Sequence, residues 1–215
     1  MLLYVVRHGE TDANTAGLLQ GSMDIPLNDS GRDLAVVTGR AMQDIHFDAC
    51  ISSPLIRAKE TAEIILRESK NDIPVSTDPR IQEMCMGEWE GKKFRPGDSE
   101  VDEDKCSLFF TDPFKFDGFP GGESTAQLCD RTQGFLKELL AKDDDRTYLI
   151  TTHGAAMRAM LNFLYEDPSS FWQEHVPYNL AVSIIETTEN GPRLIAKDRV
   201  YYSKDDIVDR YADYK

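Results

Sequence analysis

The chain has 215 residues, of which 40% are hydrophobic, and its formal net charge at pH 7 is -14. This length suits one domain, or one domain with a sizeable insertion, and the hydrophobic fraction is sufficient for a packed core. The acidic balance argues against a nucleic acid or an anionic membrane as partner, because either would require a basic surface. An acidic protein can still contain a small cationic pocket for an anionic substrate.

The four cysteines are widely spaced and include no C-x-x-C pair; they are Cys50, Cys85, Cys106 and Cys129. We therefore expect reduced thiols and a cytoplasmic protein. No apolar run approaches the length of a membrane-spanning helix, so we expect no membrane partner.

In chain order, the first predicted element is a strand over residues 2–6, a continuous apolar run of the kind buried on both faces of a sheet. It stops at Arg7-His8-Gly9. A helix is predicted over residues 29–43, with Asn28 at its N-cap position, and a second buried strand over residues 47–51.

A second helix is expected to begin with Ser53 as N-cap and Pro54 at its first helical position, with Arg57 in its first turn. A short strand over residues 74–76 follows. The periodic signal then fades, and we interpret residues 84–122 as an irregular lid insertion over the carboxyl edge of the sheet. For its acidic run, residues 98–104, a solvated surface insertion is an equally good interpretation.

The next helix is predicted to extend to about residue 141 and to open with a capping box at Ser124-Thr125-Ala126-Gln127. A buried strand over residues 148–152 leads to His153-Gly154 and to a helix over residues 155–164. The chain closes with a hairpin of two strands that turns at Asn190-Gly191.

Two histidines follow predicted parallel strands, and ligands bind outside the carboxyl ends of such strands. His8 and His153 are therefore expected to face one crevice, together with Arg7 and Arg57. Two converging arginines suit a tetrahedral anion such as phosphate. Beside it, one neutral imidazole is a competent nucleophile, and the second can donate to the phosphoryl oxygens.

Such a site also needs an acid for the leaving group. Glu83, which follows the third predicted strand, is the best-placed carboxylate in the sequence. Glu10, Glu88 and Glu90 are rivals at this stage.

Five blocks of residues, in this order and spacing, match a known family. They are Arg7-His8-Gly9-Glu10-Thr11, Ser52-Ser53-Pro54 with Arg57, Glu83 with Gly87-Glu88-Trp89-Glu90-Gly91, Gly121-Gly122-Glu123-Ser124, and Thr152-His153-Gly154. Over nearly its whole length, the chain resembles the histidine phosphatase superfamily, also called the phosphoglycerate mutase-like family. The resemblance implies a three-layer α/β/α sandwich with a mainly parallel central sheet, and residues 1–215 as a single domain.

The resemblance also implies roles. His8 is the nucleophile that becomes phosphohistidine, and Glu83 is the proton donor and later the base. Arg7, Arg57 and His153 bind and polarise the phosphoryl group, Asn14 adds a contact, and Gln20 lies at the substrate mouth. The implied binding set is Arg7, Asn14, Gln20, Gly21, Arg57, Glu83, His153 and Gly154. No metal and no cofactor are implied, because the cations of the pocket supply the positive charge.

Three functions fit these features: a phosphatase for small organic phosphomonoesters, a cofactor-dependent phosphoglycerate mutase, and a non-catalytic phospho-ligand binding module. The third predicts loss of His8, Glu83 or His153, and all three are present. Classical mutases resemble E-R-x-Y-G-A-L-Q-G after the glutamate, whereas this chain has Glu83-Met84-Cys85-Met86-Gly87-Glu88-Trp89, which is similar to the phosphatase branch. The sequence therefore favours a phosphatase with a small phosphorylated substrate, as a monomer or a homodimer.

Overall fold

The computed structural model describes residues 1–207 and 211–214. Its central sheet has six strands in the order β3-β2-β4-β1-β5-β6. The strands are β1 (Leu2–Arg7), β2 (Ala49–Ser52), β3 (Val75–Thr77), β4 (Thr147–Thr152), β5 (Val182–Thr188) and β6 (Gly191–Arg199). The first four of that order run parallel, and β5 and β6 are antiparallel to their neighbours. The prediction of a mainly parallel sheet is confirmed.

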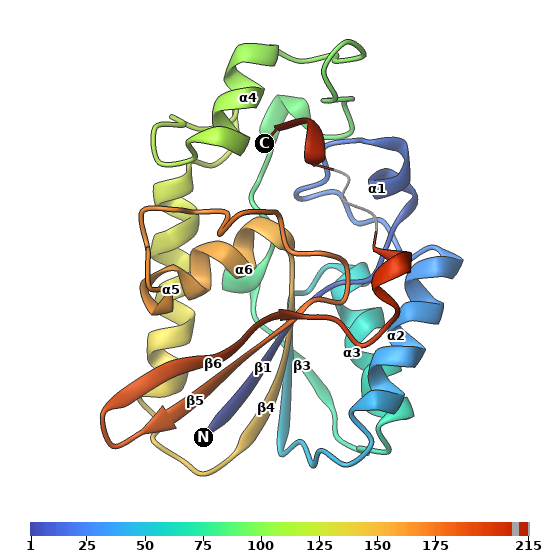
Figure 1. Cartoon of the computed structure of the whole chain (residues 1–215), viewed down its shortest axis with the longest axis vertical. Helices are drawn as coiled ribbons and strands as arrows, with labels where there is room; N and C mark the ends of the chain where they lie inside the picture. The colour runs from blue at the N-terminus through green and yellow to red at the C-terminus, as the bar shows by residue number, and fades with distance from the viewer. Residues whose placement is uncertain (208–210, 215) are drawn as a thin grey trace.

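Helices cover both faces of the sheet (Figure 1), which confirms the three-layer arrangement. On one face lie α2 (Asp29–Ala41) and α3 (Ile56–Glu68), and on the other α5 (Thr125–Leu140) and α6 (Gly154–Leu161). The short helices α1 (Asp12–Ala16) and α4 (Glu103–Thr111) lie beyond one end of the sheet. The 3-10 turns are η1 (Pro79–Ile81), η2 (Gly87–Trp89), η3 (Asn162–Leu164), η4 (Lys204–Asp206) and η5 (Ala212–Tyr214).

Strand β1 shows why a continuous apolar run folds this way. Leu3 and Val5 are fully buried in the cluster with α5 and α6, whereas Val6 is buried in the cluster with α2 and α3. Successive side chains of a strand point to opposite faces, so a strand covered on both faces must be apolar throughout. Each such burial stabilises the fold by about 1.5–3 kcal/mol.

The predicted helix starts are confirmed at two of three positions. Asn28 accepts the Gly31 N–H at the start of α2, and Ser124 forms a capping box with Gln127 at the start of α5. The prediction of Ser53 as an N-cap is wrong. Helix α3 begins at Ile56, so Pro54 is not its first residue either, and its N-cap residue Leu55 has no side-chain acceptor; the Ser53 hydroxyl contacts a histidine at the sheet edge.

The irregular segment after β3 contains a helix that the sequence analysis did not predict. Helix α4 begins where the Asp102 side chain accepts the Lys105 N–H, and it buries Phe109 and Phe110. The helix is only nine residues long and its apolar residues cluster within residues 106–110, so it shows no extended helical period, and packing against distant rings stabilises it. We infer that residues 84–122 are an insertion in a single domain over residues 1–215.

In the part of the chain that the structure describes, none of the helices has the length and apolar character needed to cross a membrane.

Candidate active site

The two histidines come together because β1 and β4 are parallel neighbours. Arg7 pairs with Thr152 in their register, so the chain leaves both strands at the same edge of the sheet. The rings of His8 and His153 lie there with centroids 5.1 Å apart, and both side chains are buried. A cavity at this edge is lined by Arg7, His8, Asn14, Gln20, Glu83 and Gly154 together with a larger set of apolar residues.

One ring nitrogen of His8 is left unprotonated by the contacts of the other. Its Nδ1 lies 2.6 Å from the carbonyl oxygen of Gly9. A carbonyl can only accept, so Nδ1 carries the hydrogen and Nε2 keeps its lone pair. Burial lowers the pKa of His8 well below 6.5, and the charges of Arg57 and Arg7 lower it further. The ring is therefore neutral at pH 7.

His153 is held by a residue from another strand end. Its Nε2 lies 2.7 Å from Oγ of Ser53, and that oxygen accepts the Leu55 N–H. The serine hydrogen is then free to point at Nε2, which favours the ring hydrogen on Nδ1. Burial, followed by the charge of Arg57, lowers the pKa of His153 well below 6.5. Its buried Nδ1 has no protein partner among the described residues.

Arg7 directs part of its guanidinium into the cavity. Its Nη1 donates to the carbonyl of Pro177, and its buried Nε has no hydrogen-bond partner within residues 1–207 and 211–214. A Cβ at Gly154 would stand 3.5 Å from that Nε, so glycine leaves the space beside it open. Together with Nδ1 of His153, this nitrogen gives the site two buried donors that can bind an anion.

Arg57 is completely buried, and its donors are largely engaged by the protein. Nη1 and Nη2 donate to the carbonyls of Met23 and Gly21 at 2.6 and 2.8 Å. Nε donates at 2.8 Å to the side-chain oxygen of Gln20, whose amide nitrogen donates to Thr11 Oγ1. Burial lowers the pKa of Arg57 to about 10, so it remains a cation at pH 7. It does not line the cavity but places a positive charge behind His8.

Glu83 lines the cavity with its carboxylate fixed by three backbone groups. It accepts the N–H of Met84 at 2.9 Å, of Ala155 at 3.1 Å and of Ala156 at 3.0 Å. The last two belong to the first turn of α6. The loop and the helix therefore hold this carboxylate beside the two histidines.

The three rival glutamates lie outside the cavity. Glu10 accepts from the Asn28 side chain and lines a different hollow. Glu90 accepts the N–H groups of Gly21, Ser22 and Met23, so it fixes the loop that supplies carbonyls to Arg57. Like these two, Glu88 is not among the described residues that line the cavity. Glu83 is thus the carboxylate that the structure brings to the histidines.

The remaining predicted binding residues lie in or directly behind the cavity. Asn14, in α1, lines it, and its side-chain oxygen accepts the Thr11 N–H at 3.2 Å. Gln20 also lines the cavity while bonding Arg57. Gly21 contributes its carbonyl to Arg57 and does not line the cavity.

Sequence reasoning gave Ser53 and Glu90 other roles and did not single out Arg131, although all three position the site. Arg131 donates to the carbonyls of Glu83, Arg80 and Gln82 and pairs with Glu123 at 2.7 Å. It therefore fixes the loop that carries Glu83. Glu90 belongs to a block that matched the family, which was the available signal, whereas Arg131 has the pattern of an ordinary helix-surface residue.

A sequence model of the histidine phosphatase superfamily, branch 1, matches residues 3–198. The chain belongs to the histidine phosphatase superfamily. It is 34% identical over 171 residues to "Phosphoserine phosphatase 1" of Hydrogenobacter thermophilus, which covers 79% of each protein. It is 35% identical over 193 residues to "Probable phosphoglycerate mutase GpmB" of Proteus mirabilis, covering 89% of this chain and 87% of that one.

The fold of this histidine phosphatase family member matches solved structures. Bacillus stearothermophilus YhfR superposes with a TM-score of 0.84 at 28% identity, covering 93% of this chain and 97% of that one.

Among residues 1–207 and 211–214, the structure groups no three His, Cys, Asp or Glu side chains in an arrangement that could hold a metal ion.

Proposed function

We propose that the protein is a phosphatase that hydrolyses small organic phosphomonoesters through a phosphohistidine on His8. The observation that carries the proposal is the state of His8, a buried, neutral imidazole whose Nε2 keeps its lone pair. Its ring centroid lies 5.1 Å from that of His153, and it lines the same cavity as Glu83. The family and the phosphatase name of a relative that is 34% identical support the same reaction.

In the first step, Nε2 of His8 attacks phosphorus, a P–N bond forms, and the P–O bond to the organic group breaks. Glu83, protonated at that moment, gives its proton to the departing oxygen, so an alcohol leaves. Nε of Arg7 and Nδ1 of His153 donate to the phosphoryl oxygens as their charge is redistributed. Both donors are already buried in place.

In the second step, the Glu83 carboxylate takes a proton from water, and the water oxygen attacks phosphorus. The P–N bond breaks, inorganic phosphate leaves, and His8 returns to its neutral state. Glu83 is again protonated, so protons balance over the cycle. The Gly9 carbonyl stabilises the hydrogen on Nδ1 while His8 carries the phosphoryl group.

Arg57, Gln20 and Asn14 have supporting roles in this proposal. Arg57 supplies positive charge behind His8, and its hydrogen bond to Gln20 is one that a phosphoryl oxygen can replace. Asn14 faces the same cavity and adds a contact to the phosphoryl group. In this proposal no metal is needed to neutralise the phosphoryl group, because Arg7 lies in the cavity and Arg57 behind it.

A mutase is the second candidate, because a relative that is 35% identical is named as a probable phosphoglycerate mutase. A mutase must bind a second anionic group of its substrate. Arg7 is the single cation among the described residues that line the cavity. That composition favours the phosphatase.

One assay separates the two candidates. The purified protein is supplied with 3-phosphoglycerate and 2,3-bisphosphoglycerate, and free phosphate and 2-phosphoglycerate are measured together, alongside phosphate release from a panel of phosphomonoesters. The phosphatase proposal expects free phosphate with little 2-phosphoglycerate. Rapid interconversion of the two phosphoglycerates would overturn it in favour of the mutase.

We further propose that the protein acts in the cytoplasm on small phosphorylated molecules, as a monomer or a homodimer. Its net charge of -14 supports the absence of nucleic-acid and membrane partners.

A further inference from the structure

The cavity above the histidines has two chemically different parts. Its polar part, here called the floor, holds Arg7, His8, Asn14, Gln20 and Glu83. Its outer wall is made mainly of aromatic rings that come from separate parts of the chain: Phe94, Phe109, Phe110, Trp172 and Tyr211. Because the phosphoryl group must reach the floor, the organic group of a bound ester lies among the rest of the lining, which consists mainly of these rings with Leu18, Leu19, Met86 and Val176.

The rings of the wall pack on one another and are therefore held in place without substrate. Phe110 and Trp172 stack with centroids 6.0 Å apart, and Phe109 meets Trp172 edge to face at 5.4 Å. Phe94 stacks on Tyr211 at 5.8 Å. A preformed aromatic wall binds another ring by stacking or edge contact at little cost in ordering.

The wall offers little to a charged organic group. The indole N–H of Trp172 is already bonded to the Phe109 carbonyl at 3.0 Å. Arg7 is the one cation that lines the cavity in the described chain, and in this proposal it serves the phosphoryl group. A second carboxylate or phosphate of a substrate would find no second cation among the described residues that line the cavity, only the neutral amides of Asn14 and Gln20.

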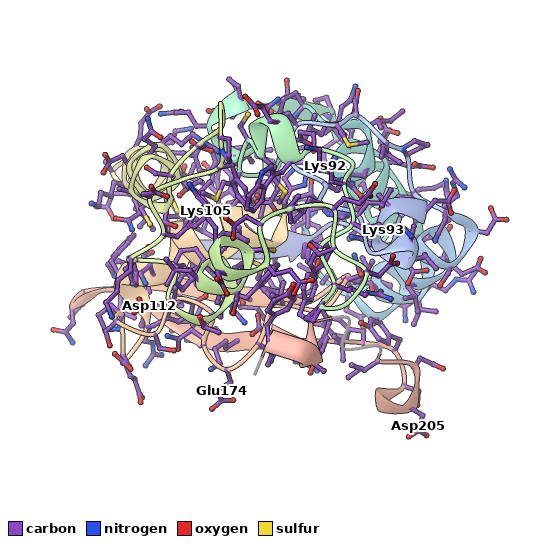
Figure 2. The ribbon with its side chains drawn as sticks, turned by 90° about the horizontal axis from the view of Figure 1, so that it is seen from above. Lys92, Lys93, Lys105, Asp112, Glu174 and Asp205 are labelled. Carbon is purple, nitrogen blue, oxygen red and sulfur yellow. The ribbon has the colours of Figure 1, made fainter. Side chains whose placement is uncertain are left out.

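Nearby carboxylates offset part of the positive charge of the insertion. Two lysines of the insertion, labelled in the view from above (Figure 2), are paired: Lys93 with Asp98 at 2.9 Å and Lys105 with Asp117 at 2.8 Å. The exposed Glu174, labelled in the same view, lines a neighbouring hollow beside Trp172 and repels anions.

Tyr211 contributes a ring to the wall from near the end of the described chain. Its ring packs on Phe94 and on Phe110, with centroids 5.8 and 5.5 Å apart, and lies 6.0 Å from the Arg7 guanidinium. It stands between the floor and the insertion. The superfamily match ends at residue 198, so this ring lies outside the matched segment.

Resting on the proposed function, we propose that the substrate is a phosphomonoester whose organic group is aromatic and carries no further charge, and that Tyr211 is a specificity-determining residue that binds that group. The proposal commits to this chemical class, and esters whose organic group is charged, such as phosphoserine, are poor substrates.

The test compares three esters with the same kind of alkyl leaving oxygen: 2-phenylethyl phosphate, ethyl phosphate and O-phosphoserine. Burial of the phenyl ring is expected to raise kcat/KM by at least about tenfold over each of the other two, mainly through KM. Phosphoserine turnover equal to or faster than that of 2-phenylethyl phosphate would overturn the inference and leave the phosphatase proposal intact.

Variants of Tyr211 test whether its ring is responsible for the preference for the aromatic ester. Tyr211→Ala is expected to reduce the ratio of kcat/KM between 2-phenylethyl and ethyl phosphate several-fold, whereas Tyr211→Phe preserves it because the ring remains. Phe163→Ala, which removes a ring that is 36% exposed and outside the cavity, is the matched control. An unchanged ratio in Tyr211→Ala would remove Tyr211 from the substrate site.

Binding separates this inference from the proposed function. His8→Ala protein is titrated calorimetrically with 2-phenylethyl phosphate and with phosphoserine. Tighter binding of the aromatic ester supports the inference even if no ester is hydrolysed, a result that would defeat only the phosphatase proposal. Equal or tighter binding of phosphoserine overturns the inference whatever the turnover.

Discussion

The hydroxyl oxygen of Ser53 lies 2.7 Å from Nε2 of His153, although the two residues are 100 positions apart in the sequence. The contact spans neighbouring strand ends, since Ser53 follows β2 and His153 follows β4. It favours the tautomer with the ring hydrogen on Nδ1. In the proposed reaction this selects Nδ1 of His153 as the donor to the phosphoryl group.

Replacement of Ser53 tests this positioning role. Ser53→Ala is expected to lower kcat by roughly tenfold to a hundredfold, because His153 no longer has a fixed tautomer. Ser53→Thr retains the hydroxyl and is expected to recover most of the loss. The ¹⁵N chemical shifts of His153 report the tautomer directly, and an unchanged tautomer in Ser53→Ala would contradict the role.

Glu83→Gln tests the general acid. Alkyl phosphates need a protonated leaving oxygen, so their turnover is expected to fall by about 10²–10⁴. The burst of p-nitrophenol from p-nitrophenyl phosphate needs little such help and is expected to fall distinctly less. Glu88→Gln, outside the cavity, is the matched control. Equal losses on both esters would assign the acid role to another glutamate.

The buried histidines predict how stability depends on pH. The pKa values of His8 and His153 are lowered well below 6.5 by burial, so the unfolded chain binds protons that the folded chain does not. The free energy of unfolding should therefore rise with pH and fall as the pH drops below 6.5. Each histidine contributes a slope of up to about 1.4 kcal/mol per pH unit.

Urea titrations between pH 7.5 and 5 measure that slope. The His153→Gln variant has one buried histidine fewer, so its slope should be smaller by up to about 1.4 kcal/mol per pH unit. His46→Gln removes a side chain that is 82% exposed and should leave the slope close to that of the unmodified protein. Identical slopes for all three proteins would show that His153 does not stay neutral on folding.

Activity is expected to survive exhaustive treatment with EDTA, because Arg7 and Arg57 supply the positive charge at the site. The measurement is phosphate release before and after chelation, with Mg²⁺ or Zn²⁺ added back in parallel. A loss of activity that either metal restores would contradict this part of the proposal.

Much of the fold could be predicted because its signals are local. The apolar run of β1, the Asn28 cap and the Ser124 capping box each lie within a few residues. The apposition of His8 and His153 then follows from parallel pairing, since both residues end strands at one sheet edge.

The rest depended on contacts between distant segments. Helix α4 is stabilised by rings outside it: Phe110 packs on Trp172 and on Tyr211, which belong to other parts of the chain. Ser53 matched a helix cap by its local sequence, but its hydroxyl contacts His153 instead. No sequence period encodes which backbone groups will hold Glu83, because two of them come from α6, more than 70 positions away.

The central claim is that His8 carries the phosphoryl group during turnover. Rapid quenching of the protein with ³²P-labelled substrate measures this directly. The account predicts a labelled protein whose phosphate is labile in acid and stable in base, as a phosphoramidate is, and no label in a folded His8→Ala variant. An acid-stable adduct, or label retained in His8→Ala, would contradict it.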